Sequence, residues 1–127
     1  MKSNTFSHCI FTKDIHTIYL PVRHGEGKLV VDTAKTLEEI KRGGHIVMQY
    51  SDERGNITSQ YPYNPNGSTE SVAGLCDSTG RIFGLMPHPE AFVRRIQHPR
   101  WTREALSEEG EGLAIFRNAF KYVTENL

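Results

Sequence analysis

A histidine and a glutamate lie two residues apart at the end of an apolar run, in Gly84-Leu85-Met86-Pro87-His88-Pro89-Glu90. In an extended backbone, residues i and i+2 project to the same face, so His88 and Glu90 can address one site. Pro87 and Pro89 remove two backbone donors and stop the strand from continuing in a ladder. An imidazole base with an orienting carboxylate is two thirds of a nucleophilic triad. The pattern therefore predicts a strand that ends at a catalytic site, or else a solvated polar loop.

The residues before this motif predict the strand that carries it. Residues 71–76 and 81–86 are joined by Asp77-Ser78-Thr79-Gly80, which is typical of a hairpin. Residues 51–70 are rich in Asn, Gly, Ser, Pro and Tyr, and predict a long loop of the kind that is often functional. Near the N-terminus, the runs 6–11 and 15–22 predict a second antiparallel hairpin.

Two amphipathic helices and two further strands complete the expected elements. Asp32 or Thr33 can cap a packing helix that ends at Gly43-Gly44. Short strands are expected at 28–31 and 45–50. Trp101 is the only large apolar anchor expected between Ala91 and Gly112. The last helix, about 112–126, is predicted to dock on the sheet through an apolar stripe formed by Leu113, Phe116, Phe120 and Val123.

A second loop, Leu20-Pro21-Val22-Arg23-His24-Gly25-Glu26-Gly27, again combines a histidine with a glutamate. Its two glycines allow the backbone to approach a ligand closely or to adopt positive φ. The residues alone leave two interpretations open, a ligand loop beside His88 or a simple turn between strands.

These motifs, taken in order, resemble the C-terminal part of the glutaminase component of phosphoribosylformylglycinamidine synthase. The resemblance is carried by the loop at 20–27, by Asn64-Pro65-Asn66-Gly67-Ser68, by residues 72–76, by the motif at 84–90 and by Gly112-Leu113-Ala114-Ile115-Phe116-Arg117-Asn118-Ala119. It covers nearly the whole chain. It implies an α/β fold, the C-terminal part of a class I glutamine amidotransferase (flavodoxin-like) sandwich, with a mixed sheet, hairpins and two packed helices. Residues 1–127 would then be one partial domain.

The same resemblance implies a Cys-His-Glu triad in which His88 is the base and Glu90 its orienting carboxylate. His24, Gly25, Glu26 and Gly27 would form a ligand or interface loop. In the family the cysteine lies on a glycine-flanked elbow, farther upstream of the histidine than this chain extends. Cys9 and Cys76 lack such glycines and occupy apolar runs, where free cysteines are usually buried. We therefore expect a domain without its nucleophile-bearing half, inactive alone. Many family members have arginine after the motif glutamate, where this chain has Ala91.

The resemblance also implies the partners. Glutamine would be the substrate, and the partner would be a synthase subunit or a chain that supplies the missing half. ATP and magnesium would belong to the synthase, with no cofactor on this chain. Loss of the N-terminal strands would leave an unpaired sheet edge, so a homo-oligomer is also predicted.

Composition excludes several other classes. The chain has 127 residues, enough for one domain at most. Its 15 basic and 15 acidic residues give no net charge, so neither nucleic acid nor a membrane surface is an expected partner. No apolar run is long enough to span a bilayer. Two cysteines without CxxC spacing fit a reducing compartment, and we expect a cytoplasmic protein.

Two alternative functions remain open at this stage. His24, Glu26, His88 and Glu90 could together bind a divalent metal and activate water, although the Pro-Cys-x-x-Cys of zinc deaminases is absent and we expect no metal site. The other alternative is an assembly module that folds and associates without catalysis.

Overall fold

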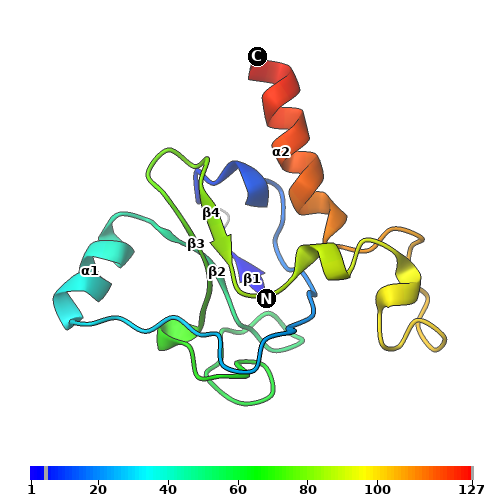
Figure 1. The fold of residues 1–127 in the computed structure, drawn as a ribbon, viewed down its shortest axis with the longest axis horizontal. Coiled ribbons are helices and arrows are strands. Elements are labelled where there is room, and N and C mark those ends of the chain that lie inside the picture. Colours follow the sequence, from blue (N-terminus) through cyan, green and yellow to red (C-terminus); the bar gives the residue numbers. More distant parts are fainter. Residues whose placement is uncertain (5, 127) are drawn as a thin grey trace.

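The computed structural model describes residues 1–4 and 6–126, which contain one four-stranded sheet (Figure 1). The strand order is β1-β2-β3-β4, and each strand pairs with its neighbour antiparallel. The strands are β1 (Lys2–Ser3), β2 (Ile46–Gln49), β3 (Val72–Cys76) and β4 (Phe83–Leu85). The α/β class is confirmed, whereas the mixed sheet is wrong for the described residues, because all three strand pairings there are antiparallel.

Helix α1 (Ala34–Arg42) begins at the predicted cap and lies to one side of the sheet (Figure 1). The Thr33 hydroxyl accepts a hydrogen bond from the Thr36 amide at 3.1 Å, which satisfies one free donor of the first turn. Gly44 follows the helix with a φ of +67°, a left-handed conformation that favours glycine. No residue of α1 is fully buried, so this helix contributes less packing than predicted.

Apolar residues of the N-terminal segment fill the core, but they do so without a hairpin. Residues 10–12 form a 3₁₀ turn, and the only pairing of residues 15–22 among the described parts is an isolated bridge between Thr17 and Lys2. Bonds from Ser3 N to His16 O and from Ile18 N to Met1 O tie this segment to the chain start. The predicted hairpin is wrong because the apolar spacing reflects burial of an irregular segment. The main core cluster consists of Ile15, Ile18, Leu20, Met48, Tyr50, Ala73 and Ile115.

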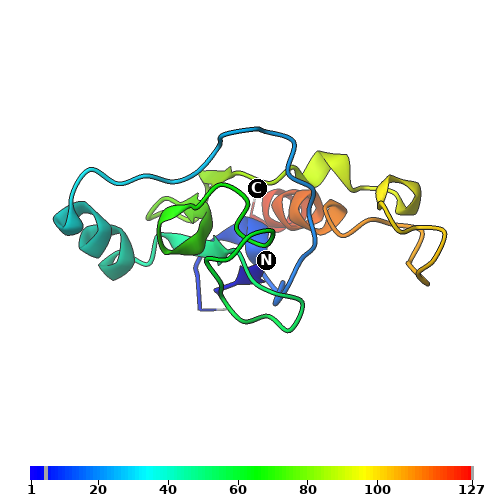
Figure 2. The ribbon, with the colours of Figure 1, turned by 90° about the horizontal axis from the view of Figure 1, so that it is seen from below.

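The expected strand at 28–31 is also wrong, and these residues run as coil towards α1 (Figure 2). The amide of Leu29 donates to the Ser68 hydroxyl at 2.9 Å, and the Leu29 carbonyl accepts from the Thr69 amide. The segment is therefore attached to the 64–71 loop by local contacts instead of a ladder.

Helix α2 (Leu113–Asn126) has the predicted bounds but docks through a different face. Ile115 is buried, and Asn118 Nδ2 donates to the carbonyls of Phe11 and Lys13 at 3.0 and 2.8 Å. Phe120 of the predicted stripe is 72% exposed, and Phe116 and Val123 are 44% and 47% exposed. The prediction failed because α2 contacts mainly the 10–12 and 89–91 turns, while its C-terminal part projects from the body (Figure 1). Trp101, at 42% exposure, is not the expected anchor.

The hairpin before the His88 motif is confirmed, with β3 and β4 joined by a turn that Asp77 organises. The Asp77 carboxylate accepts bonds from the amides of Thr79, Arg81 and Ile82 and from the Thr79 hydroxyl. These bonds, the Thr79 hydroxyl first, hold the pKa of Asp77 well below its usual range. No helix in the described residues is long and apolar enough to cross a membrane.

Candidate active site

His88 lies three residues after the end of β4 and is held in place by backbone hydrogen bonds on both sides of Pro87. The Met86 amide makes the last ladder bond, to Ala73 O at 2.9 Å, and Pro87 is fully buried. The His88 amide then donates to Pro21 O, also at 2.9 Å, which joins the 84–90 motif to the start of the 20–27 loop. The two motifs singled out in the sequence are therefore physically connected.

Glu90 reaches the imidazole through a turn. Pro89–Ala91 form a 3₁₀ turn directly after His88, and this turn brings Glu90 Oε1 to 2.7 Å from His88 Nδ1. The predicted contact is present, although it is made by a turn and not by two side chains on one face of a strand. Ala91, where many family members have arginine, is buried.

The electrostatics of this pair define the role of each imidazole nitrogen. The hydrogen bond with His88 lowers the pKa of Glu90, and Arg23 adds a smaller effect of the same sign. An ionised carboxylate only accepts hydrogen bonds, so His88 Nδ1 is the donor. In the neutral imidazole, Nε2 then carries the lone pair that a general base needs. The His88 side chain is 35% exposed and can be reached from outside the chain.

The 20–27 loop contributes two of its four predicted residues to this region. The rings of His24 and His88 have centroids 6.2 Å apart, with 42° between their planes. A side chain at Gly27 would strike the ring of His24 and the Met86 side chain, so glycine is required there for close approach. Gly25 and Glu26 are exposed, and no described atom lies near a Cβ placed at Gly25.

Asn66 belongs to this region but was not predicted as a site residue. Its side-chain nitrogen lies 3.0 Å from Gly27 O and 3.2 Å from His24 Nδ1. In the sequence, Asn64-Pro65-Asn66-Gly67 is a turn signal and part of the family resemblance, but neither indicates which distant residue Asn66 would contact.

Neither cysteine is close to His88 along the sheet. Cys76 pairs with Phe83, at the end of β4 away from His88, and it shares a small buried cluster with Cys9 and Val47. Burial and the neighbouring Cys9 raise the pKa of the Cys76 thiol. A buried thiol with a raised pKa is a poor nucleophile.

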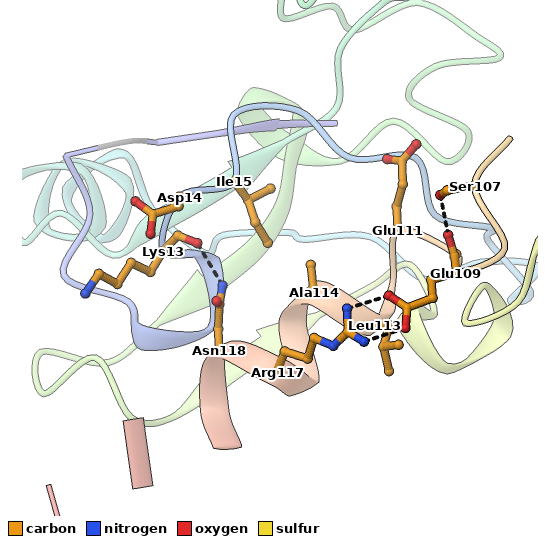
Figure 3. Close-up of a pocket in the computed structure, with 11 residues that line it drawn as sticks. Lys13, Asp14, Ile15, Ser107, Glu109, Glu111, Leu113, Ala114, Arg117 and Asn118 are labelled. Carbon is orange, nitrogen blue, oxygen red and sulfur yellow. Dashed lines mark hydrogen bonds and ion pairs between the residues drawn. The ribbon is translucent and has the colours of Figure 1, made fainter. Parts of the chain in front are cut away.

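A cavity of about 370 Å³ lies between residues 13–15, residues 107–111 and the start of α2 (Figure 3). Three of its charged groups already have partners, since Arg117 is paired with Glu109 and Glu111 Oε2 accepts from the Tyr19 amide at 2.7 Å. Its lining contains neither His88 nor Glu90. Across residues 1–4 and 6–126, no group of three or more His, Cys, Asp or Glu side chains is placed to hold a metal ion.

The chain is similar to known proteins over almost its full length. The family of CobB/CobQ-like glutamine amidotransferase domains matches residues 1–123. The phosphoribosylformylglycinamidine synthase subunit PurQ of Dehalococcoides mccartyi is 50% identical over 122 residues, which are 96% of this chain and 46% of that protein. PurQ of Methanococcus maripaludis strain S2 is 42% identical over 127 residues, covering 91% of this chain and 46% of that protein.

A larger relative shows the same similarity within a longer chain. The phosphoribosylformylglycinamidine synthase of Saccharomyces cerevisiae is 36% identical over 129 residues, which cover 96% of this chain and 9% of that protein. The chain thus spans about half the length of the PurQ relatives. The resemblance to the glutaminase component of this synthase is confirmed, and the chain belongs to the family of CobB/CobQ-like glutamine amidotransferase domains.

Proposed function

We propose that this chain carries the base and the orienting carboxylate of a glutaminase that supplies ammonia to phosphoribosylformylglycinamidine synthesis in purine biosynthesis. The observation that carries the proposal is the 2.7 Å contact between His88 Nδ1 and Glu90 Oε1, which leaves His88 Nε2 available as a base. The PurQ relatives, which are named as subunits of that synthase, support the reaction class.

In this proposal the nucleophile is a cysteine from residues outside this chain. His88 Nε2 takes the thiol proton, and the thiolate attacks the side-chain amide carbon of glutamine. His88 then returns the proton to the departing nitrogen, so that ammonia leaves and a thioester remains. Water hydrolyses the thioester to glutamate and regenerates the thiol. Glu90 stabilises the imidazolium that forms twice in this cycle.

The proposal extends to partners and cofactors. The chain would act with a synthase subunit, and ATP and magnesium would be bound by that subunit, since this chain would need no cofactor for amide hydrolysis. The nucleophile-bearing half would complete the domain, and copies of the completed or isolated chain would associate.

The isolated chain is predicted to release no measurable glutamate from glutamine, because its two cysteines are buried away from His88. Loss of one central triad member costs on the order of 10⁶ in turnover. Adding the part of the Dehalococcoides PurQ that lies outside the match should restore glutamate release. Glutamate release is measured with glutamine as the substrate. In a separate sample, the protein is treated with a glutamine-mimicking alkylator, and mass spectrometry identifies the cysteine that carries the label.

The matched variants are His88→Gln and His16→Gln, the second at an exposed histidine away from the site. We expect the alkylator label on the cysteine of the added part. Glutamate release should be lost in His88→Gln and kept in His16→Gln. Glutamate release by the isolated chain, with the label on Cys9 or Cys76, would show that the chain contains a complete triad and refute this assignment.

A further inference from the structure

One side-chain amide joins the turn at residues 64–68 to the 20–27 loop of the candidate active site. Asn66 Nδ2 lies 3.0 Å from the Gly27 carbonyl oxygen and 3.2 Å from His24 Nδ1. A carbonyl oxygen can only accept, so the Asn66 group that faces it is the NH₂ group, which has two hydrogens to donate. His24 Nδ1 must therefore accept the second bond. In the neutral imidazole this places the His24 proton on Nε2.

The turn that carries Asn66 is itself fixed by buried hydrogen bonds. Asn64 is 3% exposed, and its side chain accepts from Ser68 N at 2.9 Å and donates to Ser68 O at 3.1 Å. The Ser68 hydroxyl donates to Val72 O at 2.6 Å, which attaches the turn to β3. Asn66 is therefore held on a rigid support, and its amide can orient a neighbouring ring.

His24 Nε2 is a buried nitrogen for which the described residues offer no hydrogen-bond partner. Buried polar groups are nearly always paired, and an unpaired donor carries a free-energy cost that a bound acceptor removes. The His24 ring lies beside the His88 ring, at a centroid separation of 6.2 Å. The His24 ring therefore borders the region that a ligand at His88 would occupy.

We propose that Asn66 is a positioning residue that fixes His24 as the Nε2–H tautomer and thereby offers a hydrogen-bond donor to a carbonyl or carboxylate oxygen of the amino-acid substrate at His88. The identity of the ligand rests on the glutaminase function proposed above. The tautomer and its dependence on Asn66 concern this chain alone and can be measured without catalysis.

The first measurement is ¹⁵N NMR of the imidazole rings of the full 127-residue chain. Spectra are recorded near pH 8.5, where histidines are mainly neutral. His24 is assigned from the signals lost in His24→Gln. We expect Nε2–H in the wild type. In Asn66→Asp, the carboxylate accepts from Nδ1–H, and the proton should move to Nδ1.

The matched control is Asn126→Asp at the end of α2, which makes the same charge change far from the loop and should leave the His24 tautomer unchanged. Asn66→Ala tests the loss of the bond without an added charge, and a mixture of tautomers is expected. Backbone amide spectra establish that each variant is folded. A wild-type Nδ1–H form, or the same tautomer in wild type and Asn66→Asp, overturns the proposal.

The second measurement uses the glutaminase completed with the nucleophile-bearing half. Asn66→Asp should raise KM for glutamine by roughly tenfold or more with a smaller change in kcat, because a ligand hydrogen bond is lost while the base is unchanged. An unchanged KM together with an altered tautomer refutes the donor role. If the wild-type assembly itself does not turn over glutamine, the proposed function fails, and the NMR result still decides whether Asn66 positions His24.

Discussion

At the scale of single residues, Pro89 decides where the carboxylate lies. It starts the 3₁₀ turn after His88, and this turn returns Glu90 to the Nδ1 side of the imidazole. Pro87, fully buried on the other side, anchors the backbone on which the imidazole stands. The two prolines thus do more than end a strand, because they define both the position and the partner of the histidine.

Glu90→Gln tests this pair, since glutamine keeps the size of the side chain but removes its charge. In the completed glutaminase we expect kcat to fall by roughly 10²- to 10⁴-fold, because the imidazolium loses its stabilising carboxylate. KM for glutamine should change little. Steady-state glutamate release measures both constants, and Glu53→Gln, at an exposed glutamate in a distant loop, is the control. Equal kcat values for Glu90→Gln and wild type would exclude the orienting role.

Asp77 gives a prediction for the pH dependence of stability. Its pKa is lowered in the folded chain, so the carboxylate stabilises the fold at pH values above the unfolded pKa near 4, and this contribution is lost as pH falls further. Thermal unfolding followed by circular dichroism should show that Asp77→Asn lowers Tm at pH 7 and weakens its decrease between about pH 5 and pH 3. Parallel Tm curves for the two proteins would contradict this role.

At the scale of elements, α2 is asymmetric in a way that its sequence does not reveal. Three of its four stripe residues are largely exposed, whereas the face with Ile115 and Asn118 contacts the body. The apolar stripe and the docked face are thus different surfaces. Stability and association should respond to different substitutions in the same helix.

Ile115→Ala tests the docked face of α2, and Phe120→Ala tests its exposed apolar stripe. Ile115 is 4% exposed within the core cluster, so its truncation should lower the free energy of unfolding by about 2–5 kcal/mol. Phe120 is 72% exposed, and its truncation should cost less than about 1 kcal/mol. Urea unfolding gives both values. A larger loss for Phe120 than for Ile115 would mean that the stripe is buried in the isolated chain.

At the scale of the whole molecule, the apolar surface is not fully covered. β4 is an edge strand, Ile82 beside it is 71% exposed, and the α2 stripe is exposed as well. Unpaired edges and apolar patches are sites where other chains attach. These features mark β4 and the α2 stripe as the surfaces that an attached chain would cover.

We therefore expect the isolated chain to self-associate at micromolar concentration. Sedimentation velocity should show species larger than a monomer, and an apolar dye should bind to the chain. Phe120→Glu should reduce both signals, because it places a charge in the centre of the α2 stripe, whereas Lys121→Glu, an exposed residue beside the stripe, should have less effect. A stable wild-type monomer without dye binding would argue against an uncovered apolar surface.

Local signals predicted much of this fold. The β3–β4 hairpin, the Thr33 cap and the bounds of α2 depend on residues close in sequence, and each was found. The predicted hairpin at residues 6–22 and the predicted docking face of α2 were wrong. Whether an apolar segment is buried without forming strands, and which face a helix turns towards the core, depend on contacts with residues distant in sequence. For the candidate site, His88 and Glu90 were readable from their spacing, whereas Asn66 was not, since it meets His24 across 42 positions.

The burial of both cysteines has a practical consequence for labelling chemistry. Cys9 and Cys76 are 2% and 4% exposed, and burial raises the pKa of Cys76, so the folded chain offers little thiolate at neutral pH. A fluorescent maleimide applied under native conditions would therefore give a low background from this chain. Any strong signal in an assembly would come from a cysteine on another polypeptide. The partner's cysteines can therefore be labelled without first removing Cys9 and Cys76 from this chain.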